Sequence, residues 1–383
     1  MPQNKKHHYV PRFYLKRFTA NERLINLYNL KAERKILDAR LKGQCYRNYL
    51  YGQDGPIEKA LSHIEGGASQ LMRKIDHYKM PPPPGTEDHY LMIVYLMMQR
   101  GRTVYASDTI NEMFDKMTKA TLSDYFKQQK GIDLSEFEIG IEDSASYALA
   151  LSMRMYPLLF DMHYKLFVNK TNVEFITSDH PVVLYNQLFN FRNIGSNCGL
   201  ACKGLQIFFP VGPKQLIVMY DGATYRVGGN KFTIDITSPR DVYELNTLQM
   251  CSAVDNVYFN DPAINMEALH RKARPFLRKS RAVVRASIVK ETPKGSEQLV
   301  GMSSEDIRTN LEISEITIRG SAKKWREEFK REKLQPVAVV RDQKLVDDFE
   351  EFDDACKAKK YETSQFVDFL ADKYGKKEDQ ASR

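Results

Sequence analysis

The sequence predicts a mixed α+β protein in which a mixed or antiparallel sheet of at least five strands is packed against a helical subdomain. Between residues 56 and 160 the apolar residues recur at the spacing of an amphipathic helix. From Tyr164 onward they follow the period of two that is typical of strands. Hydrophobic residues make up 42% of the 383 residues and aromatic residues 11%, which is enough apolar surface for a sizeable core.

Length and charge divide the chain into two parts. A chain of 383 residues exceeds one ordinary domain of roughly 150 residues. Residues 302–383 carry 17 Lys and Arg against 19 Asp and Glu, whereas residues 1–301 carry 40 against 30. We therefore expect a basic main domain over 1–301 and a mixed-charge helical tail or small appendage over 302–383.

The helical subdomain is predicted from four periodic segments. A short helix followed by strands is expected before it, over residues 5–50. Its own helices are expected over about 56–78, 86–105, 111–130 and 143–159. The run Pro81–Pro84 cannot be helical and predicts a stiff spacer, after which Thr86 caps the second helix.

The sheet is predicted over about 164–260. Strands are expected over 165–169, 173–177, 205–211, 215–220 and 232–236, with the first two joined by a turn at 170–172. Ser238 before Pro239 and Asp261 before Pro262 mark two helix starts. The chain therefore returns to helix after the sheet.

Residue usage predicts a cytoplasmic protein that does not enter a membrane. Residues 1–12 do not resemble a secretory signal, and the longest apolar run, Leu91–Met98, is far shorter than the ~20 residues of a membrane helix. The five cysteines are odd in number and scattered, as expected for reduced thiols. Cys198 and Cys202, near His180, could contribute to a zinc site, but no second pair exists, so two small residues in a Gly-rich turn are the preferred interpretation.

The N-terminal segment supplies the first candidate site residues. His7, His8 and Arg12 place two imidazoles and a guanidinium close together. Imidazole is a common general base and metal ligand, and a guanidinium binds phosphate well. A solvated basic segment is the alternative. The commonest nucleotide, dehydrogenase, metalloprotease and α/β-hydrolase classes are excluded, because no P-loop, GxGxxG after a strand, HExxH or GxSxG is present.

Two helices carry further polar candidates. Glu58 and Glu65 lie two helical turns apart, so both carboxylates face one side and could hold a divalent metal, unless they are simply solvent-exposed. Gln99, Arg100 and Arg102 directly follow the apolar run of the second helix. Either arginine could clamp an anionic substrate or cap helix carbonyls.

The step Thr177-Ser178-Asp179-His180-Pro181 interrupts an apolar stretch at the predicted end of a buried strand. Rigid scaffolds often present reactive side chains at such points. Asp179 is therefore the strongest single candidate for catalysis or metal binding. The competing interpretation is a turn in which the Asp179 carboxylate accepts local backbone N–H groups.

Residues 268–294 form the strongest electrostatic feature, with His270, nine basic residues and one acid. Clustered Lys and Arg with apolar anchors between them is typical of phosphate-backbone binding, although a solvated basic face would have the same composition. The basic residues are Arg271, Lys272, Arg274, Arg278, Lys279, Arg281, Arg285, Lys290 and Lys294.

These motifs also carry a family resemblance. The segment His8-x-Val10-Pro11-x-x-Tyr14-Leu15 resembles the HxVPxxYL opening of a bacterial family known as domain of unknown function 4238. The order of further residues agrees over about 5–260, namely Glu58, Glu65, Gln99, Arg102, Thr177-Ser178-Asp179-x-Pro181, Pro210 and Asn246. The resemblance implies no reaction. It implies that His8, Glu58, Glu65, Gln99, Arg102, Asp179 and Asn246 converge on one site.

Together these observations predict a metal-dependent phosphodiester hydrolase of the nuclease class. In this hypothesis one or two Mg²⁺ or Mn²⁺ ions are held by Glu58, Glu65 and Asp179. His8 would activate the attacking water, and Arg102 with Arg12 would neutralise the developing charge. Gln99, Asn246 and the basic segment would bind the substrate.

A non-catalytic module that binds a nucleotide or nucleic acid is the alternative hypothesis. Arg12, Arg102 and Asn246 would then recognise the ligand, and the tail after residue 301 would contact a protein partner. Such a module predicts an affinity that falls with salt and does not depend on a metal. Either activity could serve a toxin or a bacterial defence effector.

Overall fold

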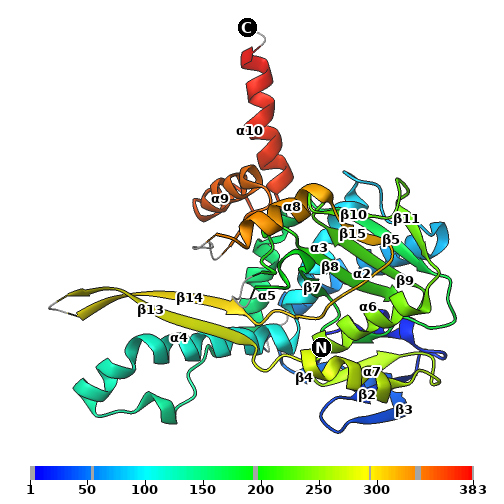
Figure 1. Cartoon of the computed structure of the whole chain (residues 1–383), viewed down its shortest axis with the longest axis horizontal. Coiled ribbons are helices and arrows are strands. Elements are labelled where there is room, and N and C mark those ends of the chain that lie inside the picture. Colours follow the sequence, from blue (N-terminus) through cyan, green and yellow to red (C-terminus); the bar gives the residue numbers. More distant parts are fainter. Residues whose placement is uncertain (1–4, 53–55, 193–196, 293–294, 333–337, 382–383) are drawn as a thin grey trace.

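The computed structural model describes residues 5–52, 56–192, 197–292, 295–332 and 338–381 (Figure 1). It confirms the predicted α+β class, with a five-stranded mixed sheet, a four-stranded sheet and three two-stranded pairs in this part of the chain. No helix within these ranges is long and apolar enough to cross a membrane.

The five-stranded sheet is the centre of the fold. Its strand order is β11-β5-β9-β8-β7, and only β11 and β5 run parallel. Its strands are β5 (His163–Asn169), β7 (Val183–Tyr185), β8 (Gln206–Gly212), β9 (Gln215–Tyr220) and β11 (Thr233–Ile236).

Both faces of this sheet are buried, which explains why its strands are almost continuously apolar. Leu166 of β5 packs into one core with α2 (Pro56–Tyr78) and α3 (Glu87–Gly101). The next residue, Phe167, packs into a second core with α6 (Pro239–Ser252). Successive side chains of a strand point to opposite faces, so one strand feeds both cores.

A four-stranded antiparallel sheet lies beside the first, in the order β3-β2-β12-β6. Its strands are β2 (Leu24–Asn29), β3 (Arg34–Arg40), β6 (Thr177–Ser178) and β12 (Asn256–Phe259). The two shortest pairs join β1 (Lys6–His8) to β4 (Tyr46–Asn48) and β10 (Tyr225–Val227) to β15 (Ile316–Ile318).

The hairpin predicted at 170–172 is wrong, because β5 and β6 belong to different sheets. The Asn169 side chain accepts from the Thr171 backbone N–H at 2.9 Å and donates to the Val173 carbonyl at 2.6 Å. These local bonds turn the chain away from β5. Of the expected strand 173–177 only Thr177 is in a strand.

The helical subdomain consists of α2, α3, α4 (Val104–Lys130) and α5 (Ser144–Arg154), as the sequence predicts. Thr86 caps α3 by accepting the His89 N–H. Helix α4 begins well before the expected residue 111, because Thr103 caps it two residues after the end of α3. A Cβ at Gly101 would lie 2.4 Å from the Ser152 Cβ, so only glycine allows α3 and α5 to approach this closely.

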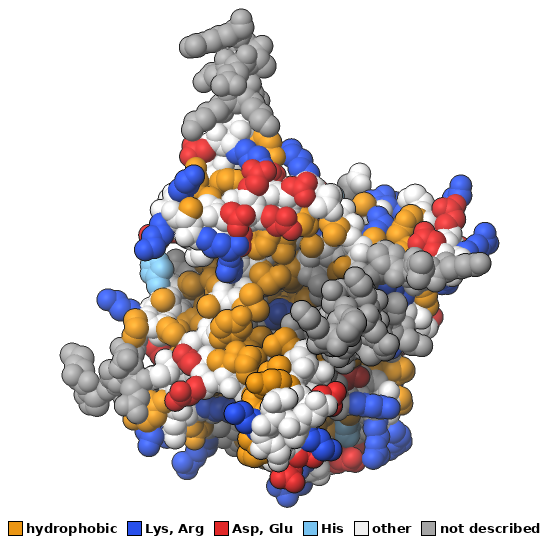
Figure 2. Space-filling model, turned by 90° about the vertical axis from the view of Figure 1, so that its left-hand side faces the viewer, with side chains coloured by type: hydrophobic (Ala, Val, Ile, Leu, Met, Phe, Trp, Pro, Cys, Tyr) orange, Lys and Arg blue, Asp and Glu red, His pale blue; other side chains and the backbone are white. Residues whose placement is uncertain are grey.

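An extended arm projects from the body where α4 and a β-hairpin run side by side (Figure 1). The hairpin pairs β13 (Ala282–Thr292) with β14 (Gly295–Ser304), where the sequence predicts only a basic segment. Hydrophobic side chains gather across the middle of the face from which the arm projects (Figure 2). Helix α7 (Met266–Ala273) precedes the arm and is capped by Asn265, four residues beyond the predicted start at Asp261.

Parts of the segment after residue 301 pack against the rest of the chain. Ile307, Leu311 and Ile316 are buried in the second core. Arg341 forms a bidentate ion pair with Asp161 at 2.5 and 2.7 Å. The helices of this segment are α8 (Gly320–Phe329), α9 (Gln343–Lys357) and α10 (Phe366–Ala381), and the short helix near the N-terminus is α1 (Arg12–Leu15). The charge pattern of this segment did not indicate these buried apolar residues.

Candidate functional site

Four of the predicted site residues meet where β1, α2 and the α3–α4 junction come together. Arg102 donates from Nη1 to the Glu65 carboxylate and from Nη2 to the His8 carbonyl, both at 2.5 Å. Glu58 adjoins these groups through His7, whose Nδ1 lies 3.6 Å from the Glu58 Oε1. We call His8, Glu58, Glu65 and Arg102 the acid–histidine cluster.

Backbone geometry holds this cluster in place. β1 pairs with β4, so His7 and His8 point to opposite sides of a short two-stranded ribbon. His7 turns inward, stacks on Tyr51 and lies with its Nδ1 3.6 Å from the Glu58 Oε1. The Tyr51 hydroxyl donates to the Arg102 carbonyl at 2.8 Å. His7 and Tyr51 thus link all three elements. Sequence reasoning missed Tyr51 and named His7 without giving it a role, although strand alternation at residues 6–8 could have separated the two histidines.

Burial shifts the pKa values of two cluster members in opposite directions. Burial raises the pKa of the Glu58 carboxyl above its ordinary value. Burial, and then the nearby Arg12, Arg102 and Lys6, lower the pKa of His8 to about 4. Both shifts favour the neutral form, so the cluster pairs a carboxyl of raised basicity with a neutral imidazole.

Several polar atoms of the cluster are buried without a hydrogen-bond partner. They are the Glu58 Oε1, the His8 Nδ1 and the Arg102 Nε. Leaving a buried donor or acceptor unpaired costs about 1–3 kcal/mol. Three such atoms in one cluster indicate a place built to receive a polar ligand.

Gln99 supports the cluster from inside the hydrophobic core. Its side chain is fully buried, and its Nε2 donates to the Tyr9 carbonyl at 3.0 Å. This bond fixes the backbone directly after His8. The structure therefore gives Gln99 a positioning role rather than the predicted contact with substrate.

Asp179 does not join the cluster. Its carboxylate accepts the backbone N–H groups of Val254, Asp255 and Asn256 at 2.7 to 2.9 Å. Burial raises its pKa to about 6, although these three bonds oppose the shift. As the alternative interpretation expects, the Asp179 carboxylate accepts backbone N–H groups, but these come from residues 254–256 and not from the local turn.

Asn246 is likewise held by backbone groups. Its Oδ1 accepts from the Ile176 N–H at 3.1 Å and its Nδ2 donates to the Glu174 carbonyl at 2.8 Å. It anchors the stretch before β6 to α6, and it is almost completely buried. The predicted convergence of Asn246 and Asp179 with His8 is therefore replaced by a structural role for both.

The donor set for a metal is correspondingly small. Among the described residues no three His, Cys, Asp or Glu side chains lie close enough to hold a metal ion together, which also applies to the zinc site considered at Cys198 and Cys202. Glu65 is engaged by Arg102, and Asp179 by backbone N–H groups. Of the three predicted metal ligands Glu58 remains, and the structure places His7 beside it, with the His7 Nδ1 3.6 Å from the Glu58 Oε1.

The predicted basic segment does not form one uniform surface. Lys272 pairs with Glu244 at 2.6 Å and Arg281 with Asp108 at 3.3 Å. Arg274 lies 3.9 Å from Glu33. Arg271 and Lys279 are exposed, Arg278 donates to two backbone carbonyls, Lys294 lies outside the described residues, and so do the side chains of Arg285 and Lys290.

A more open basic surface lies next to the acid–histidine cluster. It consists of exposed side chains on and beside β1, α1 and β4 that make no ion pair with any described residue, namely Lys5, Lys6, Arg12, Lys42 and Arg47. The Lys6 Nζ lies 4.2 Å from the Tyr46 ring centroid. His8 contacts the same ring, so cation, imidazole and phenol share one face. We call these five residues the N-terminal basic surface.

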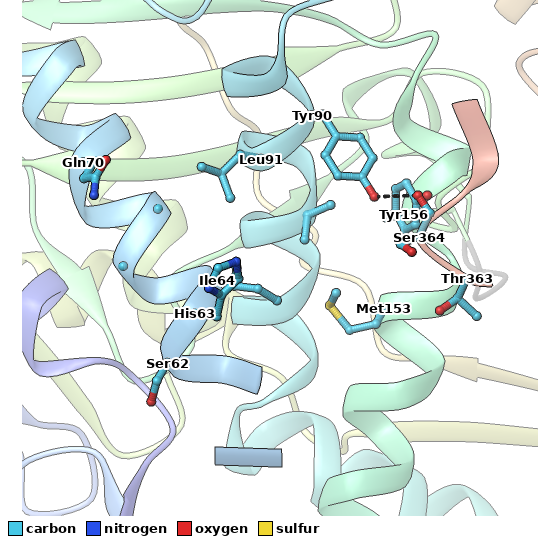
Figure 3. Close-up of a pocket in the computed structure, with 13 residues that line it drawn as sticks. Ser62, His63, Ile64, Gln70, Tyr90, Leu91, Met153, Tyr156, Thr363 and Ser364 are labelled. Atoms are coloured by element: carbon cyan, nitrogen blue, oxygen red, sulfur yellow. Dashed lines mark hydrogen bonds between the residues drawn. The ribbon is translucent and has the colours of Figure 1, made fainter. Parts of the chain in front are cut away.

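An apolar groove lies elsewhere in the described part of the chain and has no acidic or strongly basic side chain in its lining. It encloses about 760 Å³ between α2, α3, α5 and the α9–α10 connection (Figure 3). His63 and Tyr90 point toward it, and the Tyr90 hydroxyl donates to the Ser364 carbonyl at 3.0 Å. No Asp, Glu, Lys or Arg is among the described residues that line it. It is therefore not the candidate site.

The low pKa of His8 leads to a testable pH dependence of stability. In the unfolded chain the His8 imidazole takes up a proton near pH 6.5, whereas in the folded protein its pKa is about 4. The free energy of unfolding should therefore fall as pH drops through this window, by about 1–3 kcal/mol after allowance for partial exposure. Urea unfolding at pH 7 and pH 4.5 should show a smaller fall in His8→Asn. The same change at exposed His77 should leave the fall unaltered, and equal behaviour of both variants would contradict the assignment.

Comparison with known proteins places the cluster inside a family match. The profile of the family described as "Protein of unknown function (DUF4238)" matches residues 6–263, which include all four residues of the acid–histidine cluster. No curated protein and no solved structure matches the chain. The match ends before α7 and the arm.

Proposed function

The chain belongs to the DUF4238 family, and from that premise we propose that it hydrolyses phosphodiesters, as a nuclease, at the acid–histidine cluster. The observation that carries the proposal is that Glu58, His8 and Arg102, on neighbouring elements, each keep a buried polar side-chain atom without a hydrogen-bond partner. Hydrolysis of a phosphodiester needs a proton acceptor for water and a positive group for the phosphoryl oxygens. The cluster contains both.

Glu58 is the proposed general base. Its raised pKa brings proton affinity closer to neutral pH, where a general base works best. His8 stays neutral and orients the water or the substrate through its unpaired Nδ1. Arg102 is held by Glu65, so its guanidinium is fixed before substrate arrives, and exposed Arg12 adds charge from outside.

A divalent cation, Mg²⁺ or Mn²⁺, remains part of the proposal, with fewer protein ligands than the sequence predicts. Such ions are often held by one or two carboxylates together with substrate phosphates. Glu58 and His7 are the residues that would hold the ion, which would supply Lewis-acid stabilisation of the phosphoryl oxygens in place of the general-base role of Glu58.

The deciding experiment incubates the purified full chain with single- and double-stranded DNA and RNA, with Mn²⁺ and with EDTA. Cleavage that disappears in Glu58→Gln supports the hydrolase. Cleavage that survives in this variant overturns it. The reaction with EDTA shows separately whether cleavage depends on a metal. Loss of growth on expression in bacteria, relieved by the same variant, would extend the proposal to a cytoplasmic toxin or defence effector.

The N-terminal basic surface favours a second candidate, a nucleic-acid-binding module without catalysis. Unpaired Lys and Arg beside tyrosine rings are typical of surfaces that bind single strands through phosphates and stacked bases. Binding without cleavage by the wild type would select this candidate. In that case a protein partner of the segment after residue 301 would be sought as the source of activity.

The position of the binding surface is testable by paired variants. Lys6→Gln with Arg47→Gln removes two unpaired cations of the N-terminal basic surface and should weaken DNA or RNA binding. The slope of log affinity against log salt should fall by about one unit for each phosphate that the variant no longer binds. Arg271→Gln with Arg274→Gln removes the same charge from the predicted basic segment and should change binding little. The reverse ranking would place the surface on α7 instead.

A further inference from the structure

Two adjoining cavities at the base of the arm contain a separate cluster of positive groups. The larger encloses about 170 Å³ and the smaller about 20 Å³. Arg100, Tyr105, His180 and Ser304 line both. They bring together the end of α3, the start of α4, the residue after Asp179 and the end of β14. This site is independent of the acid–histidine cluster and of the proposed hydrolysis.

Two guanidinium groups face these cavities without a carboxylate partner. The Arg100 side chain makes no hydrogen bond or ion pair with any described residue. Arg278, which lines the smaller cavity, donates to the backbone carbonyls of Glu305 and Ser252 and lies 4.6 Å from the Tyr105 ring centroid. Burial, and also the charge of Arg278, lower the pKa of Arg100. An uncompensated positive charge in a sheltered site is unfavourable until an anion enters.

Neutral donors complete the lining. The Tyr105 side chain is 7% exposed, and its buried hydroxyl has no hydrogen-bond partner. His180 is 3% exposed and bonds through Nδ1 to the Thr103 hydroxyl at 2.8 Å. Burial, with Arg278 and Arg100 nearby, lowers the pKa of His180 well below its ordinary value. Burial and the two nearby arginines therefore disfavour a positive charge on His180.

The carboxylates beside the smaller cavity are engaged elsewhere. The Glu305 Oε2 accepts the backbone N–H groups of Lys279 and Ser280, both at 2.7 Å. The Asp306 Oδ2 accepts the Asn197 N–H at 3.0 Å, and burial raises its pKa. Neither acid forms an ion pair with Arg100 or Arg278 within the described residues. Although both acids line the smaller cavity, the guanidinium groups of Arg100 and Arg278 therefore keep no carboxylate partner among the described residues.

The larger cavity is apolar away from Arg100 and His180. Its wall includes Met97, Ile110, Met113, Leu151, Met155 and Leu200. An apolar cavity of ~150 Å³ is large enough to bind benzene. A ligand for the whole site therefore needs a negative head and an apolar body about as large as a benzene ring.

We propose that this site binds a small organic monocarboxylate, with its carboxylate at Arg100, Tyr105 and Arg278 and its apolar body in the larger cavity. Arginine pairs with carboxylates through two parallel hydrogen bonds, and the free Tyr105 hydroxyl can donate a third. Inorganic phosphate would fit the charge but leave the apolar cavity empty. The ligand class follows from the two cavities together.

The test measures binding of benzoate and hexanoate to the full chain by titration calorimetry and by the shift in melting temperature. Benzoate or hexanoate should bind saturably, and benzamide, which has the same shape without the charge, should bind at least tenfold more weakly. Arg100→Gln should abolish binding, whereas Arg271→Gln, at an exposed arginine on α7, should retain it. Tyr105→Phe removes only the hydroxyl and should weaken binding severalfold, which keeps the test valid if Arg100→Gln does not fold.

Four outcomes would overturn the proposal. They are the absence of saturable binding by both carboxylates, equal binding of benzamide, tighter binding of inorganic phosphate, and unchanged carboxylate affinity in folded Arg100→Gln and Tyr105→Phe. All four outcomes are measured by binding and not by cleavage, so they can be distinguished from failure of the hydrolase proposal.

Discussion

Glu58→Gln is expected to reduce phosphodiester cleavage by about 10²–10⁴-fold, the usual contribution of a general acid or base. The amide keeps the size of the side chain and a polar atom near His7, but it cannot accept a proton at neutral pH. Substrate affinity should change little, because the positive groups of the site, Arg102 and Arg12, are untouched. Single-turnover cleavage rates and binding isotherms on the same oligonucleotide separate the two effects.

The matched control for this variant is Glu138→Gln, at an exposed glutamate in the connection that follows Leu134. It removes the same charge far along the sequence from the cluster and should leave the cleavage rate unaltered. A wild-type rate in Glu58→Gln would remove Glu58 from the reaction. A decrease in binding together with the rate would instead make Glu58 a structural partner of His7 and Arg102.

Asp179→Ala is expected to lower the free energy of unfolding by about 3 kcal/mol or more. The change leaves three backbone N–H groups, those of Val254, Asp255 and Asn256, without their acceptor. Each unsatisfied buried donor costs about 1–3 kcal/mol. These groups lie where α6 ends and β12 begins, so the four-stranded sheet should loosen at β12. Urea unfolding followed by circular dichroism measures the decrease.

The control for Asp179→Ala is Asp255→Ala, because Asp255 is exposed and contributes its backbone rather than its side chain to this turn. That variant should stay within about 0.5 kcal/mol of the wild type, as surface changes usually do. If Asp179→Ala were as stable as wild type yet lacked a catalytic or binding function, the sequence-based role of Asp179 would be restored. Full stability with full function would contradict both assignments.

Local pattern accounts for most of the fold that the sequence predicts. The helices at α2, α3 and α5 and the strands β5, β8, β9 and β11 follow from periodicity, and Thr86 and Asp143 mark their helix starts correctly. Periodicity reports how one segment alternates between core and solvent. It does not report which segment lies next to it, so the predicted pairing of the strands around residues 170–172 is wrong.

The site shows the same limit. Composition and spacing identified His8, Glu58, Glu65 and Arg102, and the structure brings these four together. Asp179 was identified in the same way and Asn246 through the family resemblance, but in the structure the polar side-chain atoms of both bond to backbone groups. The sequence shows that a residue carries a carboxylate or an amide, but not whether that group bonds to the backbone or to a ligand. The difference lies in which backbone N–H groups the fold places within hydrogen-bond distance.

The sequence by itself therefore determined the α+β class, the positions of most helices and strands, and a short list of residues able to carry chemistry. Only the tertiary structure decided which of them keep unpaired polar atoms, and it added Tyr51 and the cavities at Arg100, which no motif predicts. The physical reason is that helix and strand preference acts between neighbours in the chain. Hydrogen-bond satisfaction and charge compensation depend on contacts between residues far apart in sequence, such as Arg102 with Glu65 and Asp179 with Val254.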